Sequence, residues 1–561
     1  MTVVSLERKT RLEFDSSESL EEALQCLAKL VKSNQTSKID SYSPERPNQL
    51  ARWFIGGRDY FSYLTSVLAR AKHQIFITDW FISPFVMLRR DFSKNSPETF
   101  QLNNVLLKKA EQGVKIYIQI YAAIDSVVPN AATDATKYFN ELHENIQCVK
   151  HATGVEDLLS WSHHEKLVIV DQSVAFVGGI DLCAGRYDDE TFPLYDQKTP
   201  YTWPGKDYQN TFQFDNGTPE TTNWFKDGQE NVRHNFPRCP WEDIAGVVYG
   251  KTAYDVAVHF CQRWNWAVTQ EAGHYRSTFE HLAARDDLIP RDSSFYDTTE
   301  TKFKKYENGR FLSEMQTCSV QAVRSSGNWS LGLDKEEKSI QEAYIEMIGQ
   351  AKHFVFIENQ FFVTYTGKNE FDVKNRIGLA LCDAIIKHHR NGSNFKVYIC
   401  IPHVPEFIFD GLDCREGQYE AKNIMHRQYW SIDRGENSMF NYMKKNGVLR
   451  PEDYIFFCCL RKVERQPDNG KLWGQTIYVH SKLMIVDDQQ TIFGSANIND
   501  RSMCGDRDSE FAVKIRDEIL KKSESKQVYP VGDFARQLRL RLFSKLENIY
   551  LKRFELDDII F

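Results

Sequence analysis

Two stretches of the chain repeat one pattern of apolar positions, in which the spacing of a helix gives way to the spacing of a strand. Apolar residues recur every three or four positions up to Ala71 and again up to Ala351, and a nearly continuous apolar run follows each alanine. The first spacing predicts an amphipathic helix and the second a buried strand. The apolar positions of the two predicted helices are Phe61, Leu64, Val67, Leu68 and Ala71, and Ile340, Tyr344, Met347, Ile348 and Ala351.

The sequence around these elements is itself repeated. "AKHQIFITDWFISP" (residues 71–84) resembles "AKHFVFIENQFFVT" (residues 351–364), and "GVKIYIQIY" (113–121) resembles "NFKVYICIP" (394–402). The offset between the copies is 280 residues for the first pair and 281 for the second. Two independent matches at nearly one offset predict a duplicated lobe with a strand in each matched segment.

A third matched pair combines apolar runs with charged residues. "HHEKLVIVDQSVAFVGGID" (residues 163–181) matches "VHSKLMIVDDQQTIFGSAN" (479–497) at an offset of 316, so the second copy holds about 35 extra residues before this motif. The extra residues fall around "EFIFDGLDCREGQYEAKN" and predict a rim or lid. We place the connection between the lobes at residues 271–335, after a first lobe at 46–270 and before a second lobe at 336–561.

Composition and charge restrict the class of protein. The chain has 561 residues, of which 42% are hydrophobic, and this is more than one core usually organises. A formal net charge of -7 argues against a general binder of nucleic acid. Twelve scattered cysteines without a CxxC pair, a charged N-terminus and no long apolar segment indicate a cytoplasmic protein with reduced thiols.

Both copies of the third pair obey the pattern His-x-Lys-x4-Asp-x6-Gly. Four specified residues at fixed spacing occur by chance at about one position in 10⁵. The alternative is a repeated structural strand with satisfied polar groups, but two aligned copies favour a shared site. The residues of the two motifs are His164, Lys166, Asp171 and Gly178, and His480, Lys482, Asp487 and Gly494.

Strand geometry divides these residues into two groups. Side chains alternate between the faces of a strand, so each motif histidine projects with the lysine two positions later. The adjacent His163 then points elsewhere and is predicted to be structural. Asp171 and Asp487 do not share the His/Lys face, and we assign them mainly to structure.

Two histidines and two lysines at one place suit the cleavage of a phosphodiester. One neutral imidazole can attack phosphorus while the second delivers a proton to the leaving oxygen. Lysines and amide donors stabilise the charge on the non-bridging oxygens. This chemistry requires neither a metal nor another cofactor, and the sequence contains no HExxH or CxxC motif.

With the stretches "IFITDWFISP", "IENQFF" and "GSANINDRSMCGDRDSEFAV", the two motifs resemble the HKD phospholipase D superfamily, most closely its eukaryotic phosphatidylcholine-hydrolysing branch. The resemblance runs from about Leu50 to about Leu542. It implies an α/β fold of two pseudo-twofold lobes, with mixed β-sheets flanked by helices and a single active site at the lobe interface. Residues 1–45 would be a remnant of a PH-like domain with its linker, without intact PX and PH domains.

The resemblance also implies roles for individual residues. His164 would form the phosphohistidine, His480 would protonate departing choline, and Glu510 would orient His480. Ser495 and Asn497 would bind the phosphate together with the motif lysines; the first lobe has Gly179 and Asp181 at the matching positions. The expected product is phosphatidic acid, or a phosphatidylalcohol when a primary alcohol replaces water.

Partners and alternatives follow from the same comparison. A membrane surface and small GTPases are the expected partners, and the protein would be cytoplasmic and peripheral to membranes. Tyr254 and Val258 stand where the branch has arginines, so phosphoinositide binding is not favoured. Two other hypotheses stay open: an HKD-type nuclease or phosphodiesterase, and a catalytically impaired scaffold. An aromatic choline pocket could use Trp80, Phe81, Trp161, Tyr195 or Trp203, and the sequence does not choose among them.

Overall fold

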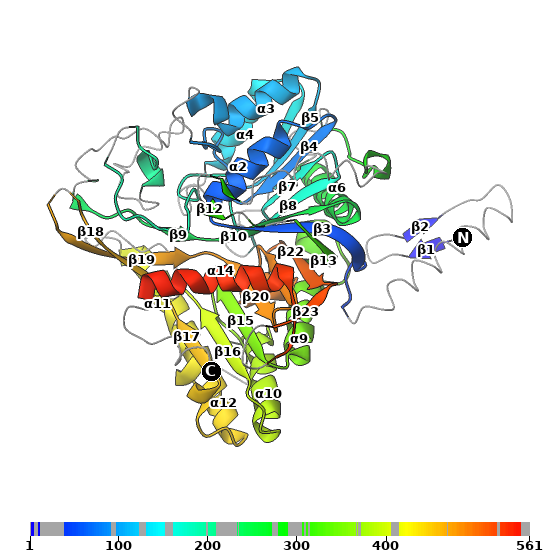
Figure 1. Ribbon diagram of the computed structural model, residues 1–561. Helices are drawn as coiled ribbons and strands as arrows, with labels where there is room; N and C mark the ends of the chain where they lie inside the picture. Colours follow the sequence, from blue (N-terminus) through cyan, green and yellow to red (C-terminus); the bar gives the residue numbers. More distant parts are fainter. Residues whose placement is uncertain are drawn as a thin grey trace.

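The strands predicted from the repeated segments all join one mixed sheet in the computed structural model of the chain (Figure 1). Within the described residues this sheet has 15 strands, and its main path is β17-β16-β15-β20-β21-β22-β13-β3-β10-β8-β7-β4-β5-β6. The structure describes residues 2–4, 9–11, 39–90, 97–122, 131–151, 161–197, 200–208, 233, 235–271, 279–289, 306–307, 310–311, 313, 315–365, 367, 372–404, 415–467, 469–523 and 528–550.

The parallel and antiparallel strand pairings follow the same order from both edges of the sheet, as expected for a duplicated chain. From either edge inward, two parallel pairings are followed by four antiparallel ones, and the halves meet where β3 pairs antiparallel with β13. The α/β class and the two pseudo-twofold halves are therefore confirmed. The strands of the first half are β3 (Arg46–Ile55), β4 (Gln74–Asp79), β5 (Lys115–Tyr121), β6 (Ile146–His151), β7 (Leu167–Val170), β8 (Val174–Gly178) and β10 (Ile244–Tyr249). Those of the second half are β13 (Gln316–Ser326), β15 (Phe354–Asn359), β16 (Lys396–Cys400), β17 (Ile455–Cys458), β20 (Lys482–Val486), β21 (Gln490–Gly494) and β22 (Glu510–Asp517).

Helices cover both faces of the sheet, and the predicted amphipathic patterns account for their placement. α2 (Gly57–Leu68) and α9 (Ser339–Gln350) bury the apolar positions predicted for them. They lie with α3 (Leu102–Glu111) and α10 (Ile377–Arg390) on the outer faces of their own halves. α6 (Lys251–Glu271) and α14 (Asp533–Tyr550) pack instead into a core cluster that contains residues of both halves. This shared core holds the two halves together by burial of apolar surface.

Short elements complete the chain outside the main sheet. Two antiparallel strands, β18 (Leu460–Arg465) and β19 (Leu472–Val479), form a hairpin, and β19 also pairs in parallel with β9 (Trp241–Glu242). The remaining elements include β1 (Thr2–Val4), β2 (Lys9–Arg11), α4 (Ala132–Leu142), α11 (Arg415–Tyr429) and α12 (Met439–Lys445). Residues 406–414 of the expected rim segment lie outside the described residues, and the rest of that segment forms the start of α11. Among the described helices, none is long and apolar enough to cross a membrane.

The two motif aspartates occupy equivalent turns. Asp171 follows β7 and Asp487 follows β20, and both have positive φ angles, 47° and 52°. The carboxylate of Asp487 accepts hydrogen bonds from the backbone N–H groups of three successive residues, 352–354, at 2.7 to 2.8 Å. Asp171 makes the same three bonds to residues 72–74. Both carboxylates therefore fix the start of a neighbouring strand and do not point toward the histidines.

Replacing Asp487 should cost stability, because its side chain satisfies three backbone donors. We expect Asp487→Ala to lower the free energy of unfolding by about 2 to 4 kcal/mol, since hydrogen bonds to a charged acceptor contribute about 1.5 to 3 kcal/mol each and water replaces part of them. Asp487→Asn is the matched control, because Asn tolerates the left-handed backbone and keeps one acceptor oxygen. If Asp487→Asn lowers the temperature of thermal unfolding as much as Asp487→Ala does, the result contradicts this role of the carboxylate.

Candidate active site at the seam between the halves

Each motif histidine lies just before its strand, where the chain is paired with the opposite half. The backbone N–H of His164 donates to the carbonyl oxygen of Ser509 at 3.1 Å, and that of His480 donates to Glu242 at 2.8 Å. Ser509 directly precedes β22 in the second half of the chain, whereas Glu242 lies in β9, in the first half of the chain. Each motif is thus hydrogen-bonded to the opposite half of the chain, across the seam where β3 pairs with β13.

The side chains of the histidines follow the same exchange. The Nδ1 atom of His164 lies 3.0 Å from both carboxylate oxygens of Glu510, and the Nδ1 atom of His480 lies 2.7 Å from Oδ2 of Asp243. The prediction that Glu510 orients His480 is therefore wrong. Glu510 holds the histidine of the other half, because Ser509, the residue just before β22, is bonded to the first motif across the seam.

Asp243 is the residue that the sequence reasoning missed. In the register of the sheet, Ala245 pairs with Gly178 and Ala512 pairs with Gly494, so Asp243 and Glu510 occupy equivalent positions two residues before these alanines. The signal in the sequence is weak, since "PWEDIAG" and "DSEFAV" share little beyond an acid and an alanine. Only the sheet register reveals that they correspond.

These bonds define the chemical state of both imidazoles. A carboxylate only accepts hydrogen bonds, so Nδ1 of each histidine carries the proton. In the neutral ring the lone pair then resides on Nε2, the atom on the side of the ring away from the carboxylate. The arrangement prepares two nitrogen atoms for attack or proton transfer.

Glycine and serine at one equivalent position adapt the site to acids of different length. Ser495 donates to Oε2 of Glu510 at 2.5 Å and accepts from the backbone N–H of Phe511 at 3.0 Å. At the matching Gly179, a Cβ atom would collide with Oδ1 of Asp243. The shorter aspartate brings its carboxylate closer to the backbone and leaves no space for a side chain. Ser495, expected to bind phosphate, is here a support for Glu510.

The lysines are buried beside the histidines and are held differently in the two halves. Lys166 donates to the carbonyl oxygen of His164 at 2.8 Å and lies 3.2 Å from Asp181. Lys482 makes the equivalent bond to the carbonyl oxygen of His480 at 2.5 Å, and its second partner is Oε1 of Gln360 at 2.7 Å. Lys482 therefore faces a neutral amide, whereas Lys166 faces a carboxylate. The two lysines therefore stand in different electrostatic surroundings.

Asn497 and Asp181 are equivalent residues, and Asn497 was expected to bind phosphate. Its side chain is buried, and its Oδ1 atom has no hydrogen-bond partner among the described residues. Asp181 also contacts Arg186 at 3.1 Å. Burial by itself raises the pKa of Asp181, but Lys166 and Arg186 outweigh it and hold the pKa below its ordinary value. Asp181 thus stays ionised beside the lysine.

Burial shifts the titration of the second motif. It lowers the pKa of His480 well below its ordinary value, and the positive charges of Lys482 and Arg186 lower it further. Burial also lowers the pKa of Lys482 to about 7, against the attraction of Asp243. The pKa of Asp243 rises to about 6, again mainly through burial. Lys166 also acts on both His480 and Lys482, so the two motifs share one electrostatic environment.

Aromatic rings border both histidines. The ring of Trp80 lies 6.5 Å from that of His164, and the ring of Trp241 lies 4.8 Å from that of His480. The guanidinium of Arg186 covers Trp241 at 4.0 Å. Trp203, another candidate for a choline pocket, donates from its indole N–H to the carbonyl oxygen of Tyr187 and is buried. Of these rings, Trp80 is the one placed to line the site beside His164.

The opposite face of the first motif strand carries a buried polar cluster, as strand alternation predicts. His163 accepts a hydrogen bond from Arg263 at 2.6 Å, and Glu165 contacts both His259 at 2.9 Å and Arg263 at 3.3 Å. Burial lowers the pKa of His163 well below its ordinary value, with Arg263 adding to the effect. His163 is therefore part of the support of the strand and faces away from His164.

No group of three or more His, Cys, Asp or Glu side chains in the described part of the chain forms a candidate metal site. The acids nearest to the histidines are bonded to imidazole Nδ1 atoms or to cations. The geometry therefore offers nitrogen nucleophiles and ammonium groups, which are suited to a tetrahedral anion.

Comparison with known sequences agrees with this geometry. The family profile described as phospholipase D matches residues 67–544. Phospholipase D1 of Saccharomyces cerevisiae is 37% identical over 97% of this chain, and phospholipase D2 of Bos taurus is 35% identical over 91%. The chain spans 31% of the first relative and 54% of the second. The family profile covers most of the sequence and includes both histidine motifs, and the chain belongs to the phospholipase D family.

Proposed function

We propose that this chain acts as a phospholipase D, which hydrolyses phosphatidylcholine to phosphatidic acid and choline through a phosphohistidine. The observation that carries the proposal is the pair of imidazoles, each with its Nδ1 atom bonded to a carboxylate from the opposite half. A catalyst that forms and then breaks a bond to phosphorus needs a nucleophile and a proton carrier on opposite sides of the phosphorus atom. Two pseudo-twofold histidines provide this pair.

In the first step, Nε2 of His164 attacks phosphorus and the bond from phosphorus to the choline oxygen breaks. His480 transfers its Nε2 proton to that oxygen, so choline leaves as a neutral alcohol function. Glu510 stabilises the positive charge that develops on His164, because its carboxylate lies 3.0 Å from Nδ1. Lys166 and Lys482 stabilise the negative charge on the non-bridging oxygens.

In the second step, water attacks the phosphohistidine and transfers a proton to His480, which is now neutral. The bond from phosphorus to nitrogen breaks and releases phosphatidic acid. A primary alcohol in place of water gives a phosphatidylalcohol by the same route. The low pKa of His480 suits this step, since a neutral imidazole is the form that accepts a proton.

The first step requires the opposite protonation state, and the substrate itself supplies the conditions for it. In the free protein, burial and the charges of Lys482 and Arg186 disfavour a proton on His480. A phosphodiester carries one negative charge, which offsets these cations when it binds between the lysines. Binding therefore raises the pKa of His480 toward the range in which it can act as an acid.

The substrate class places the protein at a lipid surface. We propose that it acts as a peripheral membrane protein, with small GTPases as partners. Phosphoinositide binding is not favoured, and Arg263, which lies in α6 with Tyr254 and Val258, does not contribute to it. This arginine is buried, and its guanidinium contacts Glu165 and His163. It therefore supports the first motif strand and presents no charge to a membrane.

Trapping of the covalent intermediate tests the function. We expect a short-chain phosphatidyl-p-nitrophenol to release a burst of about one equivalent of nitrophenolate, because this leaving group needs no proton from His480. A phosphate label should remain on His164 after alkaline quenching and peptide mapping, and should accumulate in His480→Asn.

The controls separate the catalytic histidines from histidines in general. His164→Asn should show no burst, whereas His73→Asn should match the wild type because His73 is exposed and precedes β4, at the end of that strand remote from Trp80. Label on neither motif histidine would defeat the mechanism. A chain that releases no choline from phosphatidylcholine would favour the scaffold hypothesis.

The two carboxylates should affect different steps, because each holds a different histidine. We expect Glu510→Gln to suppress the burst, and Asp243→Asn to preserve the burst but slow the later release, with turnover reduced by about 10² to 10⁴ in each case. The reverse assignment of the two phases would show that the histidines have exchanged roles.

The pH dependence should expose the lowered pKa of Lys482. A lysine with a pKa of about 7 carries its charge only below that pH, so kcat/KM for an anionic diester should fall as the pH rises above about 7. Lys482→Arg keeps its charge at all these pH values and should lose this alkaline limb, although its maximum will be lower. An alkaline limb that is unchanged in the arginine variant would assign it to another group.

A further inference from the structure

A buried lysine toward the end of α14 forms an ion pair with a residue at the seam between the halves. Lys545 is 4% exposed, and its Nζ atom donates to Oε1 of Glu242 at 2.6 Å. Glu242 is itself only 1% exposed. Two buried charges of this kind depend on each other, because the loss of one leaves the other without compensation.

Glu242 is directly connected to the second catalytic histidine. Its backbone oxygen accepts the hydrogen bond from the N–H of His480, and the next residue, Asp243, holds the imidazole of His480. β9, which contains Glu242, has only two residues. A displacement of Glu242 would therefore be transmitted to both bonds that orient His480.

A second buried acid, Glu358, interacts electrostatically with both Glu242 and Lys545. Burial raises the pKa of Glu358, at the end of β15, to about 8, and the negative charge of Glu242 raises it further. Lys545 acts in the opposite direction on both acids. Near neutral pH Glu358 therefore holds its proton, and Glu242 is the charge that Lys545 compensates.

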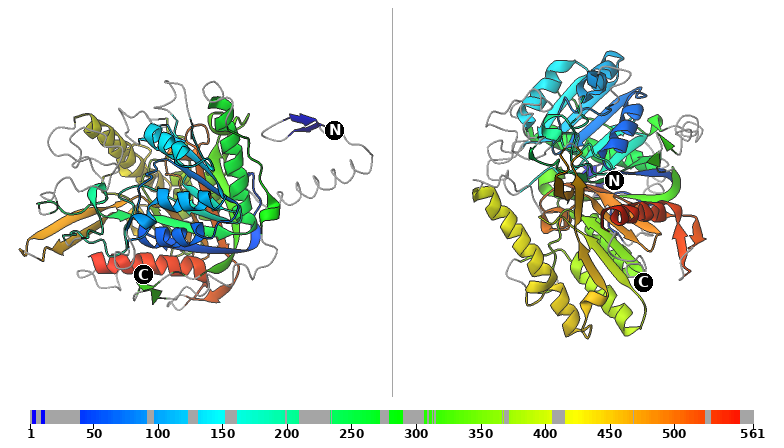
Figure 2. Two further views of the ribbon diagram at one scale, coloured as in Figure 1. Left: turned by 90° about the horizontal axis from the view of Figure 1, so that it is seen from above. Right: turned by 60° about the vertical axis from the view of Figure 1, so that its left-hand side comes forward.

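α14 reaches this position by spanning the seam, as Figures 1 and 2 show. Its start belongs to the second half, where Asp517 accepts from the backbone N–H groups of Phe534 and Ala535 at 2.9 and 3.1 Å. Further along, Arg539 lies 2.6 Å from Asp488 of the same half. Beyond this point the helix contacts the first half.

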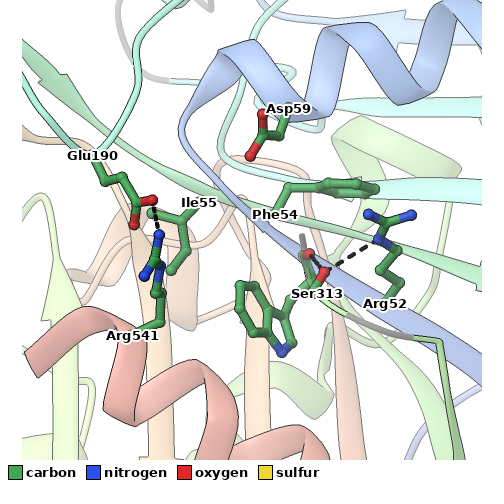
Figure 3. Close-up of a pocket in the computed structure, with 8 residues that line it drawn as sticks. Arg52, Phe54, Ile55, Asp59, Glu190, Ser313 and Arg541 are labelled. Carbon is green, nitrogen blue, oxygen red and sulfur yellow. Dashed lines mark hydrogen bonds and ion pairs between the residues drawn. The ribbon is translucent and has the colours of Figure 1, made fainter. Parts of the chain in front are cut away.

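Among the described residues, Arg541 and Lys545 form ion pairs that join α14 to the first half. Arg541 contacts Glu190 at the edge of a small cavity that is also lined by Asp59 and Arg52 (Figure 3). Arg541 is partly exposed, whereas Lys545, one turn later, is buried. The two pairs thus make the same connection between the halves at different depths. Only the deeper pair contacts a residue bonded to His480.

We propose that Lys545 is a positioning residue of the active site, which holds Glu242, and through it Asp243 and His480, in the geometry for proton transfer. This rests on the proposed phosphodiester chemistry only for its effect on turnover. The analogous support of the first motif comes from His259 and Arg263 of α6. α6 and α14 would thus support the two motifs with different residues.

A set of neutralising variants tests the proposal. Lys545→Met leaves a buried, uncompensated carboxylate at Glu242, so we expect the release phase that depends on His480 to slow by about tenfold or more while the burst on His164 persists. Adding Glu242→Gln removes that charge and should restore release to within about threefold of the wild type. Arg541→Met is the matched control on the same helix and should leave both phases unchanged.

A measurement without substrate separates this proposal from the proposed function. In protein labelled with ¹⁵N-histidine, the His480 resonance is assigned by its loss in His480→Asn. Lys545→Met should raise the pKa of His480, because a cation is lost and a buried acid is left beside it, and the double variant should reverse the shift. This readout applies even if the wild type proves to have no turnover.

Three results would overturn the proposal. They are an unchanged His480 titration in Lys545→Met, an equal loss of both kinetic phases, and a failure of Glu242→Gln to restore either readout. Each would assign Lys545 to general stability of the fold. An effect of Arg541→Met as large as that of Lys545→Met would likewise show that α14 acts only by holding the halves together.

Discussion

The exchange of carboxylates across the seam is the constraint on which the rest of the site depends. Each half contributes one histidine, and the acid bonded to that histidine comes from the other half. Neither half therefore contains a complete pair of imidazole and carboxylate. The antiparallel pairing of β3 with β13 and the core shared by both halves must hold the relative position of four side chains to within hydrogen-bond tolerance.

Burial is the physical source of the chemistry at this seam. Side chains that would be charged in water lie here among their partners, and the cost of desolvation brings the pKa values of Asp243 and Lys482 to about 6 and about 7 and lowers that of His480. Groups whose pKa values lie close together exchange protons with small changes in free energy. In the proposed function, the anionic substrate would change this balance by adding one negative charge between the lysines.

Pseudo-symmetry places the backbone, and local substitutions make the two halves different. Gly179 and Ser495 occupy one equivalent position, and Asp181 and Asn497 occupy another. Gly179 leaves space for the carboxylate of Asp243, whereas Ser495 donates to Glu510. Asp181 forms an ion pair with Lys166. The first half neutralises its lysine with a carboxylate, whereas the second leaves its lysine beside an amide. A symmetric fold can therefore assign different tasks to its two histidines.

The sequence by itself determined the duplication, the α/β class and the two motifs, because these depend on local spacing and on repeated patterns. It also indicated that His163 faces away from His164, since alternation along a strand is a local property. Only the tertiary structure decided which acid holds which histidine, because strands remote in sequence exchange partners across the seam. For this reason Asp243 escaped the sequence reasoning and Glu510 was paired with the wrong histidine. The buried contact between Lys545 and Glu242, 303 residues apart in the chain, has the same origin.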